Sequence, residues 1–97
     1  MATVTMRYWA AARDAAGVAE QRVTADTLEA ALEAALKAGL GGGDQAGGER
    51  AGGERLAAVF RRSSFLVDGN PVGLRAADSV LLADGNVIEV LPPFAGG

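Results

Sequence analysis

The sequence of 97 residues contains no cysteine and no histidine. These absences exclude disulfide bonds, thiolate and imidazole metal sites, cysteine nucleophiles and every catalytic triad that needs a histidine. The carboxylates are scattered over helix and turn positions, and their spacing brings no pair together for acid–base catalysis. We therefore expect no metal or cofactor bound by this chain and no independent hydrolase or transferase activity.

Basic residues and long apolar runs are also scarce. Nine Lys and Arg against 12 Asp and Glu give a formal charge of -3, which disfavours nucleic acid and anionic membranes as partners. No apolar run approaches the roughly 18 residues of a transmembrane span, and the N-terminus lacks the charged-then-apolar pattern of a signal peptide. We therefore expect a cytoplasmic protein with no nucleic-acid partner and no membrane partner.

Apolar residues and glycine are what the chain has in quantity. Apolar residues make up 49% of the sequence, and a chain of this length fits one domain with one small core. Glycine occurs 14 times, where average usage gives about 7. Two of these residues, Gly96 and Gly97, stand at the end of the sequence. The positions of the glycines are therefore informative.

Hydrophobic patterning predicts the element order β-β-α-loop-α-β-β-β. Period-two alternation predicts a first strand over residues 4–9 and a last, β-branched strand over residues 87–91. The main helix begins at Asp26 or Thr27, where Asp26 with Glu29 forms a capping box, and it ends before Gly39. A helix packed on one face of a mixed sheet is the economical arrangement at this size. The other expected elements are strands over 19–24, 65–67 and 72–74, a helical turn over 10–16, a short helix over 56–62, and turns over 68–71 and 84–86.

Residues 41–54 predict a flexible, glycine-rich loop inserted between the two helices. The segment contains a tandem repeat, in which Ala46–Arg50 is followed by the identical Ala51–Arg55. A phosphate-binding loop would need a preceding strand and a Gly-Lys-Ser/Thr motif, and neither is present. We therefore interpret the repeat as an insertion in a tolerant surface loop.

Three segments together resemble one known family. The C-terminal Leu91–Gly97, with its Pro-Pro stop and terminal Gly-Gly, resembles the end of the small, ubiquitin-like subunit of molybdopterin synthase, the MoaD family. Residues 4–13 resemble the opening strand of that family, and residues 81–90 resemble the segment before its tail. The resemblance covers the chain except for residues 41–53. It implies an α+β, ubiquitin-like β-grasp fold of four to five strands over residues 1–93, with a flexible tail over residues 94–97.

The resemblance also implies a function and a set of partners. The Gly97 carboxylate would be adenylated and then thiocarboxylated, with Gly96 beside it, and would donate sulfur to the molybdopterin dithiolene. The chain would be a non-catalytic subunit and cosubstrate of molybdopterin synthase. The catalytic side chains would come from a MoaE-like large subunit, and an E1-like (MoeB-like) adenylating enzyme would use ATP. A sulfur donor system completes the implied set of partners.

The chemistry of such a tail is consistent with the residues that form it. A carboxylate is a poor electrophile, whereas an acyl adenylate carries a good leaving group that a persulfide sulfur can displace. Gly96 and Gly97 lack a Cβ and can enter a narrow channel. Four residues beyond Pro93 reach at most about 13–14 Å when extended. Pro92 and Pro93 end the last strand, because neither donates a ladder hydrogen bond.

A docking surface is predicted where the first and last strands meet. Alternation places Trp9 and Leu91 on the outer face of the sheet, with Val72 as a possible neighbour. A patch that holds the single tryptophan is a good candidate for a protein interface. The predicted partner-binding residues are Trp9, Val72, Leu91, Pro92, Pro93, Phe94 and Ala95.

Two alternatives to the molybdopterin role remain open. The same chemistry serves carriers for thiamine, cysteine or tRNA thiolation, and ubiquitin-like modifiers that are joined to lysines. A β-grasp interaction module with an inert tail belongs to a different functional class. Appending residues after Gly97 would impair a carrier and leave such a module unaffected.

Overall fold

A computed structural model describes the backbone of residues 2–38 and 46–93, and the side chains of residues 2–37 and 54–93. The predictions made for residues 39–45 and for the tail over residues 94–97 lie outside these ranges. The described elements are β1 (Thr3–Tyr8), α1 (Ala10–Ala16), β2 (Glu20–Thr24), α2 (Leu28–Ala38), α3 (Ala46–Arg62), β3 (Ser64–Val67), β4 (Asn70–Pro71), the 3₁₀ turn η1 (Ala77–Ser79) and β5 (Val87–Leu91).

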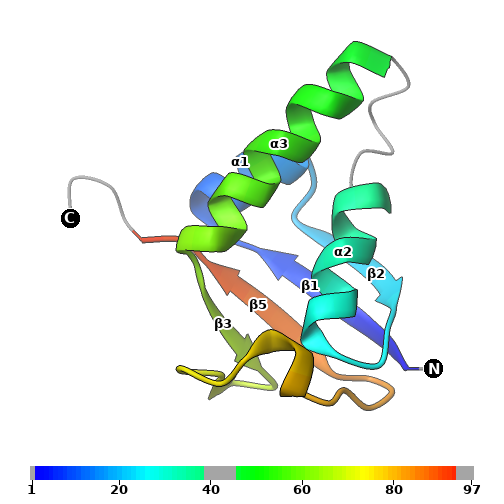
Figure 1. Cartoon of the computed structure of the whole chain (residues 1–97), viewed down its shortest axis with the longest axis vertical. Coiled ribbons are helices and arrows are strands. Elements are labelled where there is room, and N and C mark those ends of the chain that lie inside the picture. The colour runs from blue at the N-terminus through cyan, green and yellow to red at the C-terminus, as the bar shows by residue number, and fades with distance from the viewer. Residues whose placement is uncertain (1, 39–45, 94–97) are drawn as a thin grey trace.

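The strands form one mixed sheet in the order β2-β1-β5-β3-β4 (Figure 1). The first and last strands of the chain, β1 and β5, lie side by side and parallel, with Met6 opposite Ile88. The other pairings are antiparallel. The expected mixed sheet with apolar first and last strands at its centre is therefore confirmed, and β5 is its middle strand.

Strand β4 begins earlier than the sequence predicts. Asp68 and Gly69 both adopt positive φ, 51° and 83°, as the central residues of a two-residue hairpin turn do. The chain can therefore pair again at once, and Asn70 lies opposite Val67. The prediction of a return strand over residues 72–74 is wrong for this reason.

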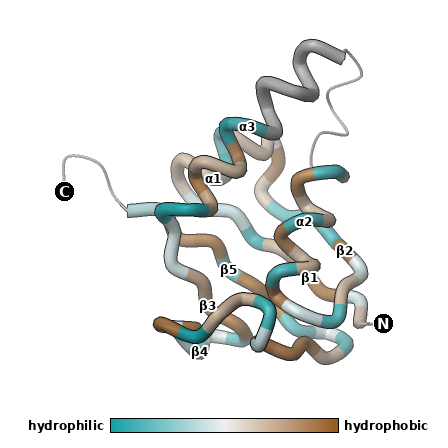
Figure 2. Tube along the Cα trace, viewed as in Figure 1, coloured by the Kyte–Doolittle hydropathy of each residue, from teal (hydrophilic) through white to brown (hydrophobic). Residues whose placement is uncertain are grey.

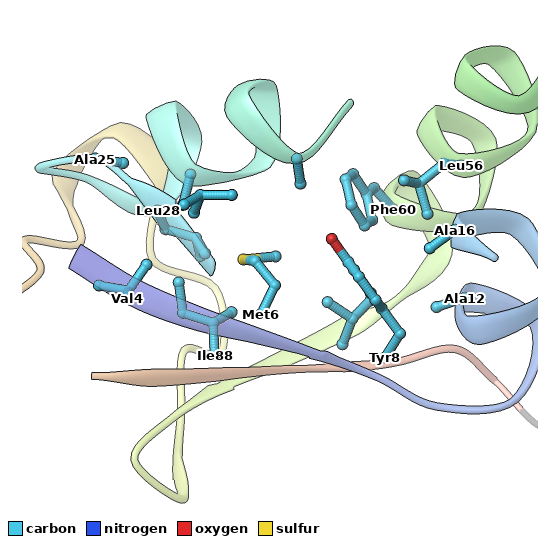
Figure 3. Close-up of a cluster of buried hydrophobic side chains, with 14 of the residues drawn as sticks. Val4, Met6, Tyr8, Ala12, Ala16, Ala25, Leu28, Leu56, Phe60 and Ile88 are labelled. Carbon is cyan, nitrogen blue, oxygen red and sulfur yellow. The ribbon is translucent and has the colours of Figure 1, made fainter. Parts of the chain in front are cut away.

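The helices cover one face of the sheet, and the core lies between the two layers (Figure 3). Figure 2 shows hydrophobic residues along β3 and β5, the strands that lie beneath this layer. Period-two alternation gives each central strand one buried face. No helix of the described residues is long and apolar enough to cross a membrane. The largest fully buried side chains are Tyr8, Met6, Leu28, Leu56, Ile88, Val4 and Val90.

Helix α2 is capped one residue later than predicted. The Thr27 hydroxyl oxygen accepts a hydrogen bond from the Ala30 N–H at 3.1 Å, which is the N-cap to N3 geometry. Asp26 still belongs to the preceding extended segment, because its carbonyl accepts the Leu82 N–H at 2.8 Å. The expectation that Asp26 is the N-cap residue is therefore wrong. The predicted helical turn over 10–16 is confirmed, and Gly17 ends it with φ 80°.

Helix α3 is longer than the expected short helix over 56–62. It begins at Ala46 and includes both copies of the repeat, so the loop predicted to extend to residue 54 is wrong for residues 46–54. Six of the ten repeat residues are Ala, Glu or Arg, which are strong helix formers. They extend a helix whose last two turns are fixed by Leu56 and Phe60, which are 0% and 7% exposed. The helix layer is therefore not one main helix but α2 and α3 together, with α1 packed against α3.

Candidate functional site

The candidate site is the end of the middle strand, where the chain leaves the sheet toward its last residues. Strand β5 ends at Leu91, as predicted, and is followed by Pro92 and Pro93. Pro92 is buried and Pro93 is exposed, so the backbone emerges from the protein between these two residues. The predicted site residues Phe94, Ala95, Gly96 and Gly97 lie beyond the described part of the chain.

Both neighbouring strands hold the end of β5 in place. On one side Leu91 lies opposite Ser64, the first residue of β3. On the other side the Trp9 N–H donates to the Val90 carbonyl oxygen at 3.3 Å. In Figure 1 the end of β5 lies beside the last turn of α3. The start of the tail is therefore set by the ends of three other elements.

Trp9 is 44% exposed, and its polar groups are all engaged. The indole Nε1–H donates to Oε1 of Glu89 at 3.1 Å. The Trp9 carbonyl oxygen accepts the N–H groups of Ala12 and Arg13, at 2.9 and 3.3 Å, in the first turn of α1. The tryptophan is therefore a fixed surface feature beside the exit of the tail.

The residue after Trp9 has an unusual backbone conformation. Ala10 adopts φ 50°, in the left-handed region that an L-residue with a Cβ rarely visits. The chain makes its sharp change from β1 to α1 at this point. Strained residues of this kind persist where the surrounding contacts determine the conformation.

The face of the sheet opposite the helices carries the predicted docking surface. The pairing places Glu89 opposite Arg7 on one side and opposite Leu66 on the other. Arg7 turns instead to Glu20, with an Nε to Oε2 distance of 2.9 Å. In Figure 3 the helices lie on the other side of the sheet from this face. We call it the outer face, formed by Arg7, Trp9, Leu66, Val87, Glu89 and Leu91.

Trp9 and Leu91 are brought together as expected, and Val72 is not part of this surface. Trp9 follows Tyr8, which lies opposite Val90, so Trp9 comes level with Leu91 at the end of the strand pair. Val72 is 6% exposed and belongs to the hydrophobic core. The expectation that Val72 joins the docking patch is therefore wrong, because the tight turn at Asp68 shifts the return strand and directs Val72 inward.

The sequence did not predict the hydrogen bond between Trp9 and Glu89. Alternation places both side chains on the outer face, which is a weak signal. To predict that Glu89 is the partner of the Trp9 indole, one would need to know the register of β1 against β5 and that Arg7 pairs with Glu20 instead. Among the described residues, no group of three or more acidic side chains is arranged to hold a metal ion.

Comparison with known proteins finds no match by sequence alone. No protein-family model matches the chain, and no curated protein matches it. Similarity is therefore found only at the level of three-dimensional structure.

Three solved structures resemble the chain over nearly its whole length. The small archaeal modifier protein 1 of Methanosarcina acetivorans matches with a TM-score of 0.68 at 20% identity, covering 100% of this chain and 98% of that chain. A putative molybdopterin converting factor subunit 1 of Pyrococcus furiosus matches with a TM-score of 0.63 at 21% identity, covering 97% and 100%. A complex of subunits 1 and 2 of the molybdopterin-converting factor of Helicobacter pylori matches with a TM-score of 0.60 at 20% identity, covering 98% and 99%.

Identities of 20% and 21% with such coverage show a common fold. The strand order, with the first and last strands parallel at the centre and the helices on one face, agrees with that result. The chain has the ubiquitin-like β-grasp fold.

Proposed function

We propose that this chain is a sulfur carrier of the MoaD type and the small subunit of a molybdopterin synthase. The observation that carries the proposal is the end of β5. The middle strand of a β-grasp sheet stops at a buried Pro92 and an exposed Pro93, and the sequence Phe94–Gly97 follows. In this proposal Gly97 is the terminal residue and its carboxylate is the group that carries sulfur.

The proposed reaction has two transfer steps at the Gly97 carboxylate. A carboxylate oxygen first attacks the α-phosphorus of ATP, and pyrophosphate leaves to give the acyl adenylate. A persulfide sulfur from a donor then attacks the carbonyl carbon, and AMP leaves with the bonding electrons. Reductive cleavage of the remaining S–S bond by a thiol leaves the thiocarboxylate. Every step takes place in a partner's active site, so this chain contributes a substrate group and no catalytic side chain.

The properties of the outer face support such a role. A carrier must bind its partners through a surface beside the tail, so that binding and insertion of the tail occur together. Trp9 and Leu91 lie at the end of β5, and Leu66 extends the apolar surface across β3. Tryptophan is among the residues that most often dominate the energy of protein interfaces. We propose that these residues, with Pro92 and Pro93, bind both the activating enzyme and the synthase.

The proposed partners are a MoaE-like large subunit and an E1-like, MoeB-like adenylating enzyme that uses ATP. The first is suggested by the structure from Helicobacter pylori, which is a complex of subunits 1 and 2 of a molybdopterin-converting factor. The second follows from the chemistry, because a carboxylate needs activation before sulfur can replace its oxygen. A persulfide donor is required for the same reason.

A ubiquitin-like protein modifier is the second candidate. It is favoured by the similarity to the small archaeal modifier protein 1 of Methanosarcina acetivorans. The activation step would be the same, and the acceptor would be a lysine amine instead of a sulfur atom. The product would then be an isopeptide bond, which reducing agents do not cleave.

The experiment uses two variants of the tail in a reconstituted transfer assay. One lacks Gly96 and Gly97, and the other carries two additional alanines after Gly97. Both should unfold at the wild-type denaturant concentration, because the changes lie beyond Leu91, where the last strand of the sheet ends. Both should lose sulfur transfer. Full activity of the extended variant would support an interaction module with an inert tail, and adducts that survive reduction would support the modifier.

A further inference from the structure

We propose that Trp9 and Glu89 form a clamp that fixes the end of β5 and thereby orients the tail for transfer. Both would be positioning residues, and neither would touch the reacting atoms. The inference rests on the proposed function, since it assigns a role in presenting the Gly97 carboxylate. It concerns a hydrogen bond inside the chain and is separate from any contact that Trp9 makes with a partner.

Trp9 is suited to this role because it joins three elements. Its backbone N–H binds the carbonyl of Val90 on β5, and its indole binds the carboxylate of Glu89 on the same strand. Its carbonyl accepts two N–H groups of α1, from Ala12 and Arg13. A shift at the end of β5 would therefore have to move Trp9, and with it the first turn of α1.

Glu89 is available for this bond because the cation opposite it in the sheet is engaged elsewhere. Arg7 is the cross-strand partner of Glu89 on β1, at a distance where opposite charges normally pair. Its guanidinium binds Glu20 instead, with an Nε to Oε2 distance of 2.9 Å. The Glu89 carboxylate accepts the indole N–H, and hydrogen bonds to an ionised acceptor are stronger than neutral ones.

The backbone beside the clamp supplies an independent observation. Ala10 has φ 50°, although a residue with a Cβ is disfavoured in this region. The hydrogen bonds of Trp9 hold this conformation in place, since its N–H binds the Val90 carbonyl and its own carbonyl binds the first turn of α1. Strained non-glycine residues cluster at active sites, ligand clamps and switch regions. Here the strained residue, Ala10, directly follows Trp9, whose indole lies at the exit of the tail.

The functional consequence follows from the length of the tail. Four residues follow Pro93 up to the proposed carboxyl terminus and reach at most about 13–14 Å, so a displacement of Pro93 leaves fewer tail conformations in which the carboxylate reaches the reacting centre. Small misplacements of a reacting group lower the rate of a chemical step, even when binding is unchanged. Glu89→Ala removes the clamp and keeps the proposed docking residues, so it is expected to lower kcat and to leave the KM for the carrier largely unchanged. Trp9→Phe also changes the docking surface, so its KM is expected to rise as well.

The first measurement tests the clamp without any partner enzyme. Hydrogen exchange by NMR reports the indole N–H and the backbone N–H of Trp9. In Glu89→Ala both should exchange faster than in the wild type, whereas Glu89→Gln retains an acceptor oxygen and should stay within twofold. Equal exchange in wild type and Glu89→Ala would overturn the clamp.

The second measurement is the steady-state kinetics of thiocarboxylation, with the carrier as the varied substrate. Glu89→Ala and Trp9→Phe should each lower kcat about fivefold, or about 1 kcal/mol, which is the typical net contribution of one hydrogen bond. The double variant should show no further loss of kcat, because both substitutions remove the same bond. Glu89→Gln should restore kcat to within about twofold of the wild type.

Asp84→Ala is the matched control. The Asp84 carboxylate accepts the Thr3 N–H at 2.7 Å at the opposite end of β1, so this variant removes a comparable bond far from the tail. Its kcat should equal that of the wild type. Independent, multiplying losses of kcat in the double variant, or an equal loss in Asp84→Ala, would overturn the inference. Absence of thiocarboxylation in the wild type would instead overturn the proposed function.

Discussion

Leu91, the last residue of β5, lies opposite Ser64, the first residue of β3. The residue after Leu91 therefore lies beside the junction between α3 and β3, where the Ser63 N–H binds the Phe60 carbonyl oxygen at 3.2 Å. Pro92 is buried at this position, and Pro93 is exposed. The two adjacent prolines consequently have different roles, the first in packing and the second in stiffening the exit.

Pro92→Ala should lower the free energy of unfolding by about 1 kcal/mol, from the lost apolar burial and the greater freedom of the unfolded chain. Pro93→Ala removes the same atoms from an exposed position and should change it by less than about 0.5 kcal/mol. Urea titration followed by circular dichroism measures both values. Equal effects of the two substitutions would contradict the packing role of Pro92.

At position 10, glycine should give a more stable protein than the native alanine. Its φ of 50° is costly for a residue with a Cβ and free for glycine, so Ala10→Gly should stabilise the fold by about 0.5–1 kcal/mol. The control is Ala11→Gly, one residue further into α1, where glycine should destabilise by up to about 1 kcal/mol. Thermal unfolding distinguishes the two signs, and destabilisation by both substitutions would contradict the strain at Ala10.

The buried phenol of Tyr8 makes stability depend on alkaline pH. Its hydroxyl donates to Oε1 of Gln21 at 2.7 Å, and burial raises the pKa of this phenol above its ordinary value. Above about pH 10 the phenol of the unfolded chain ionises, while that of the folded chain stays protonated. The unfolded state then binds fewer protons, so the free energy of unfolding falls as the pH rises.

Tyr8→Phe isolates this effect, because Tyr8 is the single tyrosine. The variant should lose about 1 kcal/mol at pH 7 with the hydrogen bond to Gln21. Between pH 9 and about pH 11 the free energy of unfolding should fall more steeply in the wild type than in the variant. The two slopes should differ by up to about 1.4 kcal/mol per pH unit. Parallel declines in the two proteins would show that the phenol is not the cause.

The sequence predicts most of the sheet and less of the helix layer. The alternation in β1 and β5 identifies Met6 and Ile88 as inward and Leu91 as outward, because burial of one face imposes period two. The prediction of a loop over the repeat is wrong, because glycine pairs usually indicate loops, whereas the neighbouring Ala, Glu and Arg favour a helix once Leu56 and Phe60 are packed.

The candidate site was predicted only in part, for a physical reason. Period two places Trp9 and Leu91 on one face of the sheet, and the structure brings them to one end of it. The prediction that Val72 joins the docking surface is wrong, because the φ of Asp68 sets the hairpin register and cannot be predicted from residue type alone. The bond from Trp9 to Glu89 depends on competition for Arg7, which exists only after the strands have paired.

The repeat should be dispensable for folding. Glu54 and Arg55 are exposed and Leu56 is fully buried. Among the residues whose side chains are described, α3 therefore packs on the core from Leu56 onward. Deleting residues 46–50 should change the free energy of unfolding by less than about 0.5 kcal/mol, as measured by urea titration. Leu56→Ala, the comparison variant, should cost about 2–4 kcal/mol. A loss from the deletion as large as that from Leu56→Ala would show that the repeat belongs to the core.

The intact mass of the carrier tests the central claim most directly. The protein is incubated with ATP, an E1-like activating enzyme and a persulfide donor, and its mass is compared with that of a sample without ATP. Replacement of one carboxylate oxygen by sulfur at Gly97 predicts a gain of about 16 Da that is confined to the C-terminal peptide. An unchanged mass, or an equal gain in the variant lacking Gly96 and Gly97, would contradict the account.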